Sequence, residues 1–319
     1  MKKSIMNWGI LLALFGSILF VSCNDDNDDD MDNTMNIVEF AQNNPDYTVL
    51  ADAAERAGLA DELSAPGNLT VFAPDNDAFA EFLSANGFAN LDEVPQNVLE
   101  SVLLYHVLGG QFLSTDLSNS YITTSSPSGN GDAPLTMYIN VDNGVVINGQ
   151  AEVVSADIEV SNGVIHGIDQ VISLPDVVTF ATADPSFENL VGALTAGQLN
   201  TDLVAALQAD GPFTVFAPTN QAFVNLLNSN DDWTGIGDIP GDLLETVLLY
   251  HVTDDGNVRS EDLAGEVPVN TLAGESFTIN AAVEPITITA GGNTAELIFF
   301  DVQATNGVIH VVDTVLLPN

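Results

Sequence analysis

One unit of about 140 residues occurs twice in this chain of 319 residues, and this duplication limits the possible folds more than any other feature. Three separate motifs recur in the same order and at nearly the same spacing. The motif at 69–74 returns at 213–218, the motif at 102–107 returns at 247–252, and the motif at 162–166 returns at 306–310. A unit of this length is large enough to fold around its own core, unlike one turn of a solenoid. The sequence therefore predicts two tandem domains of the same fold.

The repeat spacing also places the boundaries between the parts of the chain. The second unit begins just after Pro175, where the last motif of the first unit ends. We therefore expect a first domain over residues 36–175 and a second domain over residues 176–319. The remaining segments are a leader over residues 1–22 and an acidic stretch over residues 23–35.

Each unit opens with helical patterns and closes with strand patterns. Amphipathic periodicity predicts two short helices at the start of each unit, at 35–43 and 47–57 and again at 177–182 and 186–195. Later in each unit, apolar residues alternate with polar ones between Asn-Gly turns, which is typical of hairpins. A Ser- and Gly-rich segment at 123–134 is expected to form a mobile hairpin loop. Helices followed by strands, without βαβ alternation, favour an α+β fold with a mainly antiparallel sheet.

The N-terminus carries the pattern of an export signal. Two lysines precede an uncharged, mostly apolar stretch at 8–21, which is short for a membrane span and typical of a signal peptide. The stretch ends in Phe-Val-Ser-Cys, which resembles the lipobox of bacterial lipoproteins, with Phe20 in place of the usual leucine. This resemblance implies that Cys23, the single cysteine of the chain, is lipidated. The alternative is an ordinary signal peptide with an incidental cysteine.

A run of Asp and Asn residues follows Cys23. Like charges at the density of residues 24–33 repel one another and keep a chain extended and solvated. We therefore expect a tether that holds the folded domains away from a lipid surface. The run also resembles the export signal that sends some lipoproteins of Gram-negative bacteria to the outer leaflet of the outer membrane. An EF-hand calcium loop is excluded, because Asp30 stands where that loop requires glycine. The expected location is the cell envelope, with a lipid anchor in the outer membrane and the domains exposed at the surface.

The chain is very acidic. It carries 45 Asp and Glu residues against four Lys and Arg residues, a formal net charge of −41. Such a surface is repelled by phosphate, which excludes nucleic acid as a partner and excludes docking on anionic lipid through a basic patch. Because 46% of the residues are hydrophobic, the chain still has enough apolar surface to build cores. We expect the folded state to be more stable at high ionic strength, or to use divalent cations at acidic pairs such as Asp231-Asp232.

Taken together, the three motifs resemble those of the fasciclin domain. They are Thr-Val-Phe-Ala-Pro-x-Asn-x-Ala-Phe, a Tyr-His pair at the end of an apolar helix, and Asn-Gly-Val-Ile-His-x-x-Asp near the end of the unit. The resemblance covers nearly all of residues 36–318. It implies an α+β fold of two tandem fasciclin-like domains, each a β-sandwich or wedge with packed helices. It also implies cell-surface adhesion or binding, with extracellular or cell-surface proteins or glycans as partners.

All four histidines of the chain lie in the repeated motifs. They are His106, His166, His251 and His310. Three interpretations are open: a hydrogen-bonded structural residue, ligand recognition through the Tyr-His pair, or a metal site of two histidines with Asp169 or Asp313. In adhesive relatives the Tyr-His segment is tied to receptor contact. The binding candidates that the resemblance implies are therefore Tyr105, His106, Tyr250 and His251.

The sequence offers little support for catalysis. It contains no GxSxG elbow, no HExxH motif, no P-loop and no GxGxxG run. We therefore assign no catalytic residue, no metal site and no cofactor, and we expect a protein that is not an enzyme. An architectural component of the envelope or extracellular matrix, without a discrete ligand, is the alternative function. An extracellular hydrolase is a further one.

Overall fold

The computed structural model describes residues 35–129, 133–282 and 284–319. The predicted leader, Cys23 and the acidic tether as far as residue 34 lie outside these residues. All described residues belong to one compact unit that includes both repeats. Within the described residues, no helix is long and apolar enough to cross a bilayer.

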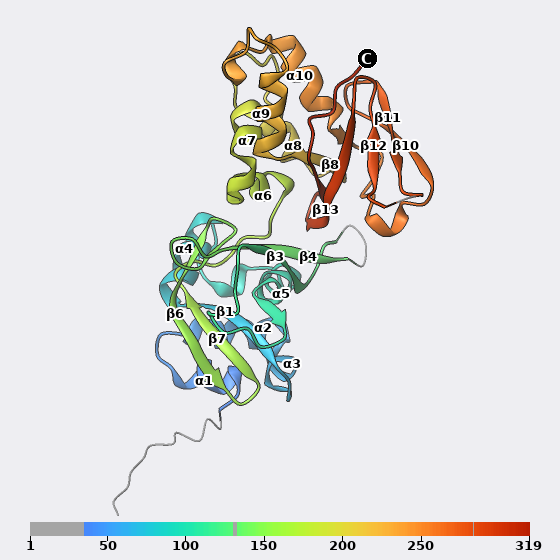
Figure 1. Ribbon diagram of the computed structural model, residues 1–319. Coiled ribbons are helices and arrows are strands. Elements are labelled where there is room, and N and C mark those ends of the chain that lie inside the picture. The colour runs from blue at the N-terminus through green and yellow to red at the C-terminus, as the bar shows by residue number, and fades with distance from the viewer. Residues whose placement is uncertain (1–34, 130–132, 283) are drawn as a thin grey trace, which may run out of the picture. The chain divides into compact units, whose positions relative to one another are not determined.

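In the first repeat, most helices precede most strands (Figure 1). Its helices are α1 (Ile37–Asn43), α2 (Thr48–Ala57), α3 (Ala60–Ser64), α4 (Asn76–Ala85) and α5 (Gln96–Tyr105). Its strands are β1 (Leu69–Pro74), β2 (Val107–Gly109), β3 (Ser120–Pro127), β4 (Pro134–Asn140), β5 (Val146–Ile147), β6 (Ala151–Val160) and β7 (Gly163–Ile168).

The second repeat runs through the same series of elements. Its helices are α6 (Val177–Ala183), α7 (Glu188–Leu194), α8 (Leu203–Leu207), α9 (Asn220–Asn228) and α10 (Gly241–Tyr250). Its strands are β8 (Phe213–Pro218), β9 (Val252–Thr253), β10 (Glu266–Asn270), β11 (Ser276–Asn280), β12 (Thr287–Thr289), β13 (Thr294–Ala304) and β14 (Gly307–Val312). The α+β prediction is confirmed, and the duplication in sequence is a duplication in structure.

The described residues of each repeat build one sheet of seven strands. Its order is β2-β1-β7-β6-β5-β4-β3 in the first repeat, and the second repeat has the corresponding order β9-β8-β14-β13-β12-β11-β10. Neighbouring strands pair antiparallel, as predicted, except that the first strand of each repeat lies parallel to the last. Val71 pairs with Ile165 in this way, and Val215 pairs with Ile309. The sequence did not predict this parallel pair.

The longest strand of each repeat bends the sheet. The early part of β6 pairs with β5 and its later part with β7, and β13 pairs in the same way with β12 and β14. The pairing of β6 with β7 and that of β13 with β14 are irregular, and Asp157 and Asp301, which lie in these irregular stretches, both have a φ of 60°. Bulges of this kind bend a strand sharply. Each bent sheet buries apolar side chains on both of its faces.

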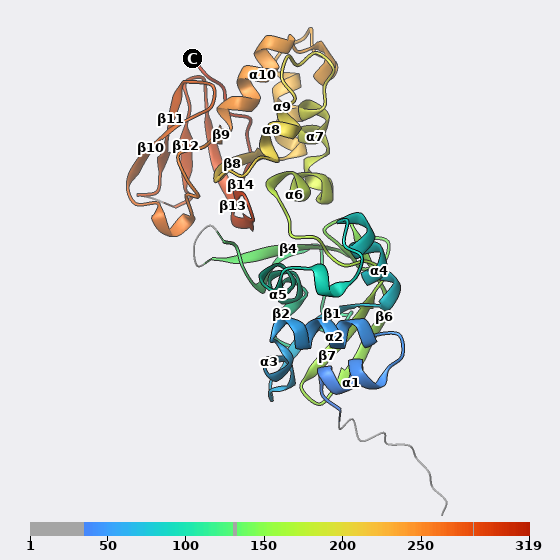
Figure 2. The same ribbon diagram turned by 180° about the vertical axis from the view of Figure 1, so that it is seen from behind.

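Each repeat accordingly contains two apolar cores. In the second repeat, helices α7–α10 lie on one side of β8 and strands β10–β12 lie on the other (Figures 1 and 2). The helical side buries Phe187, Phe223 and Ile309 in one core, and the other side buries Phe216 and Phe277 in the second. Burying a side chain of this size stabilises the fold by about 1.5–3 kcal/mol relative to exposure.

The Ser- and Gly-rich segment at 123–134 differs from its predicted structure. Strand β3 extends into it as far as Pro127, and the side chains of Thr124 and Ser126 are buried. The Thr124 hydroxyl donates to the carbonyl oxygen of Leu135 at 2.9 Å. The hairpin is confirmed, but the prediction of a loop over the whole segment is wrong, because β3 continues to pair with β4 as far as Pro127.

Candidate functional site

The two Tyr-His pairs lie at the ends of α5 and α10, and all four side chains are buried. Tyr105 and Tyr250 are 0% exposed, His106 is 1% exposed and His251 is 3% exposed. Both histidines cap the C-terminal ends of their helices, where the last carbonyl groups lack partners within the helix.

The imidazole of His106 is hydrogen-bonded at both nitrogens. Nδ1 lies 2.7 Å from the carbonyl oxygen of Val102, and Nε2 lies 2.9 Å from the backbone nitrogen of Ile172. Because a carbonyl can only accept and an N–H can only donate, the ring carries its proton on Nδ1. The ring thus ties the end of α5 to the chain that follows β7.

His251 makes the same two bonds in the second repeat. Its Nδ1 lies 2.7 Å from the carbonyl oxygen of Val247, and its Nε2 lies 2.9 Å from the backbone nitrogen of Leu316. Burial disfavours the charged ring and lowers the pKa of both His106 and His251 to about 4, although the bond to the helix carbonyl opposes this shift. Both rings are therefore neutral at neutral pH.

The tyrosine hydroxyls are also bonded inside the fold. The Tyr105 hydroxyl donates to the carbonyl oxygen of Thr136 at 2.7 Å and accepts from the Asn148 side chain at 2.7 Å. The Tyr250 hydroxyl donates to the carbonyl oxygen of Ser276 at 3.0 Å. Burial raises the pKa of both hydroxyls, so both stay protonated.

The second histidine of each repeat is bonded in the opposite sense. Nε2 of His166 lies 2.9 Å from the carbonyl oxygen of Phe112, and Nδ1 lies 3.3 Å from the backbone nitrogen of Asp157. This ring therefore carries its proton on Nε2. In the second repeat, Nε2 of His310 lies 2.9 Å from the carbonyl oxygen of Val258, and Nδ1 lies 3.3 Å from the backbone nitrogen of Asp301. Burial lowers the pKa of His310.

The carboxylates considered as metal ligands are engaged in backbone contacts. Asp169 accepts from the backbone nitrogen of Glu152 at 2.7 Å, and Asp313 accepts from that of Glu296 at 2.8 Å. Across the described part of the chain, no group of three or more His, Cys, Asp or Glu side chains is placed to hold a metal ion.

Sequence reasoning missed a further pair of buried polar residues, Asn162 and Asn306. The Asn162 side chain accepts from the backbone nitrogen of Ile37 at 3.0 Å and donates to the carbonyl oxygens of Leu63 and Ala65. Asn306 makes the equivalent bonds in the second repeat. Each side chain thus connects the start of the first helix with the last turn of the sheet. The Asn-Gly pair indicated only a turn, because tight turns favour this dipeptide whatever its side chain contacts.

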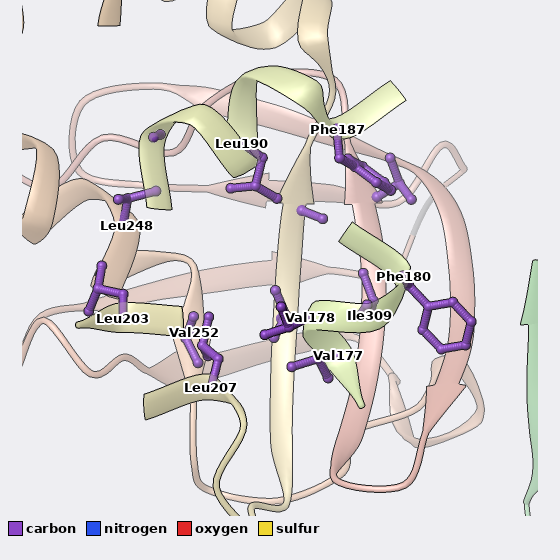
Figure 3. Close-up of a cluster of buried hydrophobic side chains, with 14 of the residues drawn as sticks. Val177, Val178, Phe180, Phe187, Leu190, Leu203, Leu207, Leu248, Val252 and Ile309 are labelled. Atoms are coloured by element: carbon purple, nitrogen blue, oxygen red, sulfur yellow. The ribbon is translucent and has the colours of Figure 1, made fainter. Parts of the chain in front are cut away.

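The second repeat also encloses an apolar void, which lies between α6, α7 and the strands β8 and β14 (Figure 3). Its volume is about 30 Å³, and Val178, Leu190 and Ile309 are among the side chains that line it. An apolar lining gives water no hydrogen-bonding partners, and ligand pockets are about ten times larger. The void is therefore a packing defect and not a binding site.

The chain matches known proteins through this repeated fold. It matches the Fasciclin domain family twice, over residues 45–175 and over residues 185–318. The chain therefore belongs to the fasciclin domain family.

Its relatives include much longer proteins. Transforming growth factor-beta-induced protein ig-h3 of Sus scrofa is 31% identical over 268 residues, which cover 82% of this chain and 36% of that protein. Periostin of Homo sapiens is 29% identical over 270 residues, which cover 83% of this chain and 30% of that protein. This chain thus spans about a third of the length of these relatives. A solved FAS1 domain pair from the insect cell adhesion molecule fasciclin I is 21% identical, with a TM-score of 0.47 over 85% of this chain and 95% of that chain.

Proposed function

We propose that this chain is a non-catalytic adhesion or binding protein that presents two fasciclin domains to extracellular proteins or glycans. A lipid on Cys23 holds it in the outer membrane, and residues 24–35 space the domains from that surface. The exposed faces of the domains then bind the partner. Membership of the fasciclin domain family in both repeats supports this role.

The observation that carries the proposal is the state of the four histidines, all of which lie within the described residues. Each imidazole nitrogen is within hydrogen-bond distance of a backbone group of its own repeat. None of these rings has a free nitrogen for proton transfer or metal binding. The repeated motifs therefore maintain the fold, and partner contact falls to exposed residues around them.

The anchor can be tested by changing Cys23 to Ser. Detergent phase separation of whole cells should place the wild-type protein in the detergent phase and Cys23→Ser in the aqueous phase, because the variant has no acyl chain. A melting temperature equal to that of the wild type would show that the variant folds normally. Wild-type protein in the aqueous phase would contradict the anchor.

Binding can be tested by attachment of cells to surfaces coated with extracellular protein or glycan. A deletion strain should attach less than its parent, the wild-type gene should restore attachment, and Cys23→Ser should not. Purified chain from residue 24 onward should compete with the cells. Deletion without any loss of attachment would refute the proposal. If the gene restores attachment but the purified chain does not inhibit it, the architectural role would be favoured.

The Tyr-His pairs remain candidates for partner recognition, and we propose that they act by positioning the surface above them. The variant Tyr105→Phe with Tyr250→Phe keeps both rings and removes both hydroxyl bonds. Below its melting temperature it should still restore attachment. A folded variant that fails to attach would instead indicate direct contact by these hydroxyls.

A further inference from the structure

A groove of about 350 Å³ lies beside β3 and β4 of the first repeat and is closed by the segment after α6 and by β13 of the second. Residues from both repeats line it, among them Tyr121, Tyr138, Asp142, Asp184 and Phe299. The ring centroid of Tyr121 lies 4.9 Å from that of Tyr138 and 5.5 Å from that of Phe299. The groove is thus lined by three aromatic rings and two carboxylates.

Asp184 is the unusual member of this group, because it is an acidic residue that is only 7% exposed. One carboxylate oxygen accepts from the Tyr121 hydroxyl at 2.8 Å, and the other accepts from the backbone nitrogen of Ser186 at 2.8 Å. Burial of a carboxylate is unfavourable unless it is paired with a cation or fully hydrogen-bonded.

The chain has almost no cation of its own to supply. The described residues include two arginines and no lysine. Arg56 pairs with Asp92 at 2.9 Å, and Arg259 pairs with Glu261 at 3.3 Å. Among the described residues, no ion pair reaches Asp184. A cation for this groove must therefore come from another molecule.

The groove also breaks the internal duplication. Asp184 caps the C-terminal end of α6, and the residue that caps the corresponding helix α1 is Asn44. Phe299 pairs with Val311, and at the matching register of the first repeat the residue is Ser155. The carboxylate and one of the rings are thus present only in the second repeat.

We propose that this groove binds the side chain of a lysine or arginine from a partner protein. Aromatic faces attract cations, and a carboxylate beside them adds a charge-assisted hydrogen bond. The volume is at the lower end for ligand sites and suits one long side chain. The net charge of −41 would draw a basic partner toward the chain. The partner class rests on the proposed binding function, but the site itself can be tested on purified protein without cells.

The test is titration of purified chain, from residue 24 onward, with the capped peptides Gly-Lys-Gly and Gly-Arg-Gly, followed by NMR at low salt. Both should shift the amide signals of residues around Tyr121, and the acetyl-lysine peptide should not. Phe299→Ser and Asp184→Asn, which install the residues of the first repeat, should each weaken binding about fivefold or more. Asp231→Asn removes the same charge from an exposed position elsewhere and should change affinity less than about twofold.

Equal binding by Phe299→Ser and the wild type would overturn the proposal, and so would equal binding of the acetylated peptide. Phe299 is 43% exposed, and asparagine caps a helix as well as aspartate does, so both variants should fold. Tetramethylammonium should compete only weakly with the peptides. If this ion bound more tightly than the peptides, the proposal that a protein side chain occupies the groove would be overturned. The absence of any shift with either peptide would also overturn this site, but it would leave the outcome of the attachment experiment, and with it the proposed function, untouched.

Discussion

The hydroxyl of Tyr47 lies where the side chain of residue 167 would stand, and that residue is glycine. A methyl group built on Gly167 would collide with the hydroxyl. In the second repeat the matching strand residue is Val311, and the residue that precedes the matching helix is Phe187, which has no hydroxyl. The two repeats thus fill one space in two ways, and each residue of the pair restricts the other.

This pairing predicts a strong coupling between two substitutions. Gly167→Ala alone should lower the free energy of unfolding by about 1–3 kcal/mol through overpacking. In a Tyr47→Phe background the same change should cost less, because the colliding oxygen is gone and the remaining contacts, with Ser155 Cβ at 3.3 Å and with the Cζ of residue 47 at 3.4 Å, are only tight. Urea unfolding of the two single variants and the double variant measures the coupling. Additive effects would show that the two residues do not share this space.

The buried histidines predict a loss of stability in mild acid. His106 and His251 have pKa values of about 4 in the folded state, against about 6.5 in an unfolded chain. Below pH 6.5 the unfolded state binds more protons, so the free energy of unfolding should fall as the pH drops toward 4, by up to about 3 kcal/mol for each ring. Urea unfolding between about pH 7.5 and 4.5 checks this.

The matched control for the acid effect is the double variant His106→Asn with His251→Asn. It should be less stable than the wild type at pH 7.5, because the backbone bonds are lost. Its stability should depend less on pH below 6.5, because the titrating rings are gone. A wild-type profile that changes no more than that of the double variant between pH 6.5 and 4.5 would contradict the burial of these rings.

The packing of α6 and α7 against the second sheet leaves space that a larger side chain can use. Val178 lines the apolar void, so Val178→Ile should raise the free energy of unfolding by about 0.5–1 kcal/mol through one more buried methylene. Val38 occupies the corresponding position in α1, and Val38→Ile is the matched control. Thermal melts of both variants measure the difference. A destabilising effect of Val178→Ile would show that the void cannot accept the added group.

The elements that local pattern determines could be predicted from the sequence. The first helix of the second repeat was predicted at 177–182 and is α6 (Val177–Ala183), because its apolar spacing is a local signal. The parallel pairing of β1 with β7 was missed, since about 90 residues separate these strands and periodicity does not indicate which strands pair. The buried polar strand positions at Thr124 and Ser126 were missed because their composition is that of a loop.

The candidate site could also be predicted only in part from the sequence. The repeated motifs located every histidine that proved to be hydrogen-bonded inside the fold. Their burial could not be predicted, because a tyrosine or histidine at a helix end fits an interface as well as a core. What decides it is the backbone nitrogen of Ile172 and the carbonyl oxygen of Thr136, which approach from strands and turns distant in sequence.

The charge of the whole molecule predicts a strong dependence on salt. With 45 acidic residues and four basic ones, the folded chain repels itself, and the Debye length falls from about 30 Å at 0.01 M salt to about 3 Å at 1 M. The melting temperature should therefore rise as NaCl is added. CaCl₂ at equal ionic strength should act equally if screening alone is responsible, and more strongly if divalent ions bridge acidic pairs. A melting temperature that rises with neither salt would contradict both ideas.

Nitrogen–proton NMR of the histidine rings in purified chain tests directly whether the two repeats hold their buried histidines by the same hydrogen bonds. At pH 7 the four rings should form two matched pairs, with His106 and His251 protonated on Nδ1 and His166 and His310 protonated on Nε2. The first pair should still be neutral at about pH 5.5. Titration of either ring of that pair near pH 6.5, or different tautomers within a pair, would contradict the hydrogen bonds described for these histidines. It would also contradict the proposal that the repeated motifs maintain the fold.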